Sequence, residues 1–72
     1  MDKRIITPEM VKDAREAAED TQAEAAARIG YTLKAWQHWE YGRRPMRPAL
    51  YDAYRFKTQR KYRKTKENTN EH

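Results

Sequence analysis

Apolar residues recur along the first 56 residues at the spacing of helices rather than strands. Four groups follow this spacing: Val11, Ala14 and Ala18; Ala25 and Ile29; Trp36 and Trp39; and Leu50, Ala53 and Tyr54. The pattern predicts helices over about 8–19, 22–29, 33–41 and 48–57. The expected fold class is therefore all-α, with four to five short helices whose apolar faces form one core.

The second and third predicted helices are separated by a short turn. Thr21 and Glu24 have the T-x-x-E spacing of a capping box, which starts a helix. Gly30 can adopt the left-handed conformation that ends a helix, and Thr32 can cap the next one. A pair of helices joined by such a turn is typical of DNA-binding helix-turn-helix units, whose second helix enters the major groove.

Charge is distributed unevenly along the chain. Residues 1–30 carry five basic and seven acidic side chains, residues 31–66 carry eleven and two, and residues 67–72 carry none and two. The net charge of +5 therefore comes from a positive region that begins near the predicted helix 33–41. This asymmetry indicates a polyanionic partner such as nucleic acid.

Three features of this stretch occur together at the spacing of a known family: the run T-Q-A-E-A-A from Thr21, Gly30 at the turn, and W-E-x-G from Trp39 to Gly42. They resemble the Xre family, the Cro and lambda-type phage repressors, over about residues 8–56. The resemblance implies a lambda-repressor-like helix-turn-helix DNA-binding domain within residues 1–56. The run A-W-Q-x-W-E-x-G-R is also similar to small phage-borne regulators, including anti-CRISPR-associated repressors.

Outward residues of the predicted helix 33–41 are candidates for contacts with base edges. These are Leu33, Lys34, Gln37 and His38. Gln can pair with adenine N6 and N7, Lys with guanine O6 and N7, His can donate or accept, and Leu can pack on a thymine methyl group. The alternative is that they form only the solvated face of an amphipathic helix.

Four further residues are candidates for contacts with the DNA backbone: Gln22, Thr32, Arg43 and Arg44. Gln22 and Thr32 stand at helix starts, where free N–H groups can hold a phosphate, and the family resemblance implies backbone contacts at both positions. Arg43 and Arg44 directly follow the predicted recognition helix. The alternatives are helix capping alone and an ordinary charged loop.

The family resemblance also implies a structural ion pair between Arg15 on the first helix and Glu40 on the third. Where related sequences usually place a Gly and an apolar residue before the Thr-Gln pair, this chain has Glu19 and Asp20. We expect a tight, exposed connection there. Residues 57–72 form a basic and then polar extension, which is expected either to continue the last helix or to be disordered.

Several classes of protein are disfavoured. The chain has no Cys and only two His, so we expect no disulfide, no metal site and no cofactor. It lacks a nucleophile–base–acid grouping and a phosphate-binding loop, so we expect neither an enzyme nor a small-molecule substrate. No apolar run approaches about 18 residues and no signal peptide is recognisable, so we expect a cytoplasmic protein without a membrane association.

The expected function is sequence-specific binding of a double-stranded DNA operator, as a phage-type repressor acting as a homodimer on a pseudo-palindrome. Met46, Tyr51 and the C-terminal extension are possible dimer-interface residues. Two alternatives stay open. An antitoxin-like protein would also bind a partner protein, and a single-strand or RNA binder would use the basic extension with its Tyr62.

Overall fold

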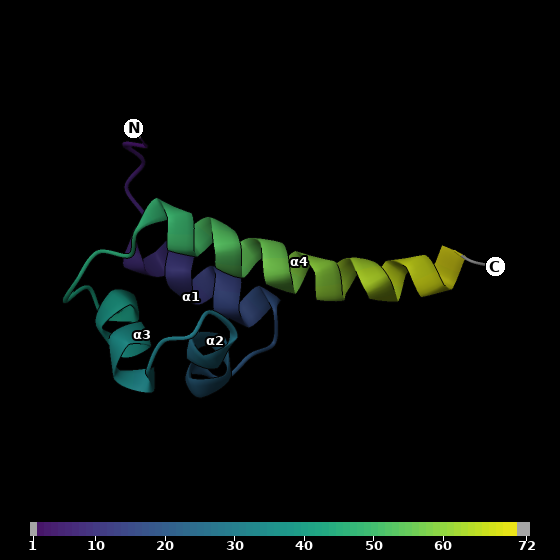
Figure 1. The fold of residues 1–72 in the computed structure, drawn as a ribbon, viewed down its shortest axis with the longest axis horizontal. Coiled ribbons are helices and arrows are strands. Elements are labelled where there is room, and N and C mark those ends of the chain that lie inside the picture. Colours follow the sequence, from purple (N-terminus) through teal and green to yellow (C-terminus); the bar gives the residue numbers. More distant parts are fainter. Residues whose placement is uncertain (1, 71–72) are drawn as a thin grey trace.

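The computed structural model describes residues 2–70, with side chains described up to residue 59 (Figure 1). Its helices are α1 (Pro8–Ala17), α2 (Gln22–Arg28), α3 (Leu33–Glu40) and α4 (Pro48–Asn70). Within this range the fold is all-α, as predicted, and β-type pairing is limited to an isolated antiparallel bridge between Ile6 and Met46. None of the helices in residues 2–70 combines the length and apolar character needed to cross a membrane.

Each of the first three helices begins at a threonine cap. The Thr21 hydroxyl accepts from the Glu24 N–H at 3.1 Å, and the Glu24 carboxylate accepts from the Thr21 N–H at 2.9 Å, which completes the predicted capping box. Thr32 accepts from the Ala35 N–H at 3.1 Å. Thr7 caps α1 in the same way, since its hydroxyl accepts from the Met10 N–H. These local signals explain why the predicted helix starts are confirmed.

The core lies where the helical spacing predicted it. Trp36 and Tyr54 are completely buried, and their ring centroids are 4.9 Å apart. Trp36 also packs edge-on against Trp39 at 5.7 Å. Ala25 and Ala26 on α2 are buried as well, and their small side chains leave room for these rings. Two indoles and a phenol therefore supply the volume that the alanine-rich α1 and α2 lack.

Two residues considered for a dimer interface belong instead to this core. Met46 is 3% exposed and Tyr51 is 9% exposed. Met46 is buried because its backbone pairs with Ile6, which draws the segment between α3 and α4 against the N-terminal arm. Both side chains are therefore used in packing within the chain and offer little surface to a partner.

The connection between α1 and α2 is not the exposed turn that was expected. The Asp20 side chain is 1% exposed and accepts from the Arg28 guanidinium at 2.5 and 2.8 Å. The Tyr54 hydroxyl donates to the same carboxylate at 2.8 Å. A charged residue can occupy this buried position because its oxygen atoms are held by an ion pair and a phenol. Glu19, by contrast, is exposed as expected.

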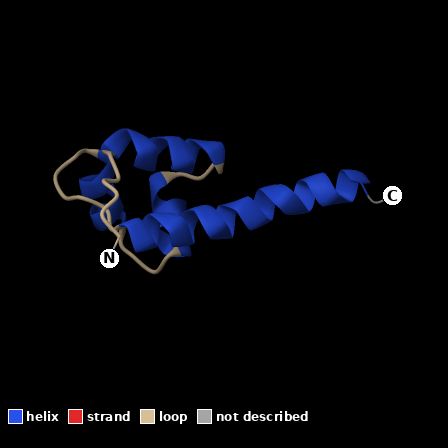
Figure 2. Cartoon of the chain, turned by 90° about the horizontal axis from the view of Figure 1, so that it is seen from above, coloured by secondary structure: helices blue, strands red, loops and turns tan. Residues whose placement is uncertain are grey.

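The last helix is longer than the predicted segment 48–57. α4 contains 23 residues and runs without interruption to Asn70. Figure 2 shows its C-terminal part extending away from the other helices. Of the two outcomes expected for residues 57–72, helical continuation therefore describes the backbone up to Asn70, while residues 71–72 lie outside the described residues.

Candidate nucleic-acid interface

The turn between α2 and α3 is closed by glycine. Gly30 has a φ of 76°, the left-handed region that a residue with a side chain rarely adopts. Its N–H donates to the Ala27 carbonyl at 3.1 Å, and the Tyr31 N–H donates to the Ala26 carbonyl at 2.9 Å. This pair of bonds is a Schellman motif, which ends α2 and allows the chain to reverse into α3.

The end of α3 repeats this motif. Gly42 has a φ of 80°, and the Arg43 N–H donates to the His38 carbonyl at 2.8 Å. The Arg44 N–H also donates to the His38 carbonyl, at 3.2 Å. The backbone of the two predicted phosphate-binding arginines is therefore attached to the last turn of α3, and both side chains are exposed.

The candidate base-reading residues share the side of α3 that faces away from the core. Leu33 is 44% exposed and Lys34 is exposed, whereas Gln37 and His38 are half-buried. The opposite side of the helix carries the buried Trp36. The helix thus keeps a polar and accessible face although its other face is anchored in the core.

One flank of this face is an open groove between α3 and the loop that precedes α4. Lys34, His38 and Arg44 line it, and Arg47 adds a third strong base. Tyr31 lines it too and packs edge-on against Trp39 at 5.2 Å. Neither Arg47 nor Tyr31 was among the residues predicted to contact DNA. The density of arginines after Gly42 was the available signal for the first, and the Gly30-Tyr31-Thr32 turn was the signal for the second.

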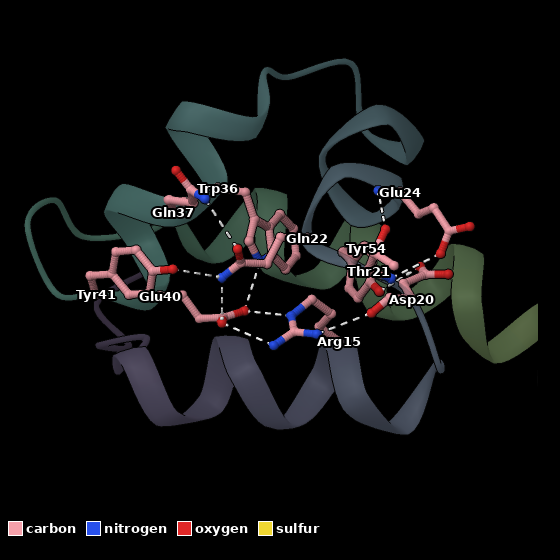
Figure 3. A network of polar contacts seen from close by, with 10 residues as sticks. All are labelled: Arg15, Asp20, Thr21, Gln22, Glu24, Trp36, Gln37, Glu40, Tyr41 and Tyr54. Carbon is pink, nitrogen blue, oxygen red and sulfur yellow. Dashed lines mark hydrogen bonds and ion pairs between the residues drawn. The ribbon is translucent and has the colours of Figure 1, made fainter.

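The other flank is a cluster of amides. The Gln37 side chain donates to the Gln22 carbonyl oxygen at 3.2 Å, and the Gln22 amide donates to Glu40 at 2.9 Å (Figure 3). The Gln22 amide also lies 3.4 Å from the Tyr41 hydroxyl. The structure therefore brings Gln22 and Gln37 together but places Lys34 and His38 on the opposite flank, while Leu33 is assigned to neither.

Beneath the amides lies an ion pair between α1 and α3. Arg15 donates to both carboxylate oxygens of Glu40, at 2.7 and 3.0 Å, and Trp36 Nε1 donates to Glu40 at 2.9 Å. A third bond from Arg15 reaches the Asp20 carbonyl at 3.1 Å. Burial by itself would raise the pKa of Glu40, but the hydrogen bonds from Arg15, Trp36 and Gln22 outweigh it and hold that pKa below its usual value.

Thr32 and Gln22 occupy the helix starts where phosphate contacts were expected. Thr32 is exposed, and its hydroxyl is used as a cap. The side chain of Gln22 is engaged with Glu40, Gln37 and Tyr41, which leaves its backbone for the expected contact. Among the described residues, no group of three or more His, Cys, Asp or Glu side chains is arranged to hold a metal ion.

Comparison of the chain with protein-family models and with curated proteins finds no match.

Proposed function

We propose that this protein is a sequence-specific regulator of transcription that binds double-stranded DNA through α3. The observation that carries the proposal is the exposed polar face of α3, held on the outside of a helix-turn-helix by an indole core and followed directly by two arginines. A helix is about 10–12 Å wide with its side chains, and the major groove of B-DNA is about 12 Å wide. α3 therefore has a suitable shape for the groove.

The charges around α3 support a duplex partner. Lys34, Arg44 and Arg47 line the protein's own groove between α3 and the loop before α4, and Arg43 lies just after α3. Cations beside a groove-reading helix neutralise phosphates and release counterions, which supplies binding energy without sequence preference. The amide flank and Leu33 add groups that distinguish base pairs.

Because the chain resembles the Xre family, we propose specifically that it represses transcription by occupying an operator. A domain of this size has few base contacts, so a homodimer on a pseudo-palindrome with half-sites about 10 bp apart is the arrangement that reaches useful specificity. With Met46 and Tyr51 buried, Phe56 at 63% exposed and Ile5 at 80% exposed are large apolar side chains that remain accessible away from α3.

Selection of bound sequences from a random duplex pool tests this function. We expect an enriched motif with two-fold symmetry, and binding that weakens as salt is raised. A matching RNA pool and a single-stranded DNA pool at the same salt concentration serve as controls. Enrichment from the RNA pool alone, or duplex binding without an enriched motif, would contradict the proposal.

A further inference from the structure

A chain of hydrogen bonds leads from the buried ion pair to the outer face of α3. Glu40 Oε1 accepts from Gln22 Nε2 at 2.9 Å, and Gln22 Oε1 accepts from Gln37 Nε2 at 3.2 Å. Figure 3 shows the amide oxygen of Gln37 on the side away from Gln22. The chain therefore connects a carboxylate whose side chain is 4% exposed to a residue at the accessible surface.

The chemistry of each group determines the direction of these bonds. An ionised carboxylate can only accept hydrogen bonds, and the other partners of Glu40, Arg15 and Trp36, can only donate. Gln22 must therefore turn its NH₂ group towards Glu40, which leaves its carbonyl oxygen towards Gln37. Gln37 must in turn direct its NH₂ group inwards. Neither amide can be reversed without placing two acceptors in contact.

The orientation of Gln37 determines what its side chain offers to a ligand. One of its N–H groups is used by Gln22, so the outward groups are one N–H donor and the carbonyl acceptor. Adenine presents an N6–H donor beside the N7 acceptor in the major groove, which matches this pair. Guanine presents two acceptors, O6 and N7, so its O6 would meet the Gln37 oxygen.

On the basis of the proposed function, we infer that Glu40 and Gln22 are positioning residues that set the amide of Gln37 to select adenine over guanine at one base pair. Glu40 acts through Gln22 and does not itself contact DNA. Its ion pair with Arg15 keeps the acceptor in place, so a contact between α1 and α3 determines a base preference.

The test uses Gln22→Met, which removes the intermediate amide and leaves the Arg15–Glu40 pair and the Trp36 bond intact. Gln59→Met, an exposed glutamine on α4, is the matched control. In the duplex that the wild-type protein selects, each base pair in turn is replaced by each of the other three, and the affinity of every protein for each duplex is measured. Gln37 reads the base pair at the position where the Gln37→Ala protein no longer prefers one base pair over the others.

At that pair we expect the wild-type protein and Gln59→Met to prefer adenine over guanine by about 5- to 150-fold, the range for a bidentate contact. In Gln22→Met the amide of Gln37 is able to turn and donate to guanine O6, so the preference should fall to about 3-fold or less. An adenine preference retained in Gln22→Met would overturn the inference and leave the proposed function standing. A wild-type protein that selects no duplex sequence would overturn both.

The side-chain amide signals of Gln37 in the free protein give a second measurement that needs no DNA. We expect these NMR signals to shift in Gln22→Met and to be unchanged in Gln59→Met. Gln37 signals identical in all three proteins would show that its amide is not held from within, and would overturn the inference.

Discussion

At the scale of single residues, Glu19 occupies a position made for glycine. The first three helices end in the same Schellman arrangement, but the left-handed residue is Gly30 after α2, Gly42 after α3 and Glu19, with a φ of 61°, after α1. The bonds at the end of α1 are complete, because the Asp20 N–H reaches the Arg15 carbonyl at 3.2 Å. The side chain of Glu19 therefore adds a steric cost that the other two turns avoid.

Glu19→Gly should stabilise the fold. Relief of the left-handed strain outweighs the added flexibility of the unfolded chain, and we expect the free energy of unfolding to rise by about 1 kcal/mol in urea titrations. Ala18→Gly is the control. Ala18 has a φ of −85°, so glycine there relieves no strain. It adds an entropic cost and removes a methyl group packed against the core, so it should destabilise. Equal effects of the two changes would show that Glu19 is not strained.

The charge of Glu40 contributes to the stability of the fold through its ion pair with Arg15. The pKa of Glu40 is lowered in the fold, so its contribution is complete above the unfolded-state pKa of about 4.3 and is lost as the pH falls through the folded-state pKa. Glu40→Gln leaves Arg15 without its carboxylate and should cost about 3 kcal/mol at pH 7.

This difference between wild type and Glu40→Gln should shrink below about pH 4.3, because Glu40 is then protonated in the unfolded chain while it stays ionised in the fold. Chemical denaturation at a series of pH values measures both effects. Asp13→Asn, at an exposed position on α1, is the control and should change the free energy of unfolding little at pH 7. A difference independent of pH would mean that the Glu40 charge does not stabilise the fold.

At the scale of elements, the proposed contacts with DNA come from two adjacent segments, α3 and the loop that follows it. The outer face of α3 carries side chains suited to base edges, whereas the loop after Gly42 carries arginines suited to phosphates. The Schellman motif at Gly42 links the two, because the N–H groups of Arg43 and Arg44 bond to the last turn of α3. Specific and non-specific affinity should therefore be separable by substitution.

Gln37→Ala or Lys34→Ala should cost about 1–3 kcal/mol on the selected duplex and little on random DNA. Arg43→Ala should weaken both by similar factors and reduce the slope of log affinity against log salt by about 1. Titrations of each variant with both duplexes at several salt concentrations measure these effects. If the Gln37 and Arg43 changes weakened both duplexes alike, the proposed division between base and phosphate contacts would be wrong.

At the scale of the whole molecule, Asp20 joins parts of the chain that are distant in sequence. Its carboxylate binds Arg28 at the end of α2 and Tyr54 on α4, and its carbonyl accepts from Arg15 on α1. The short connection between α1 and α2 is thereby held against three helices. Burial and the bond to Asp20 both raise the pKa of Tyr54, so its phenol remains a donor to Asp20.

Tyr54→Phe removes one donor from this buried carboxylate and keeps the ring in the core. We expect a loss of about 1.5–3 kcal/mol in the free energy of unfolding, measured by chemical denaturation, because the acceptor is charged. Tyr51→Phe is the matched control. The Tyr51 hydroxyl accepts from the exposed Arg55, so its loss should cost much less. Equal costs would show that the Asp20 contact is not a significant part of the stability.

Local patterns in the sequence were enough to predict the features that depend on near neighbours. The caps at Thr21 and Thr32, the glycine turn at Gly30 and the helical spacing of Trp36 and Trp39 were all predicted, because each involves residues within five positions of one another. These signals were sufficient for the fold class and for the outward face of α3.

Contacts between side chains on different helices became known from the packing of the folded chain. Asp20 is buried because Tyr54, 34 residues away, reaches it, and Met46 is buried because it pairs with Ile6. The bond between Gln37 and Gln22 likewise depends on how α2 packs against α3. Local patterns cannot specify such contacts, because burial and hydrogen-bond direction are set by partners that chain folding brings together.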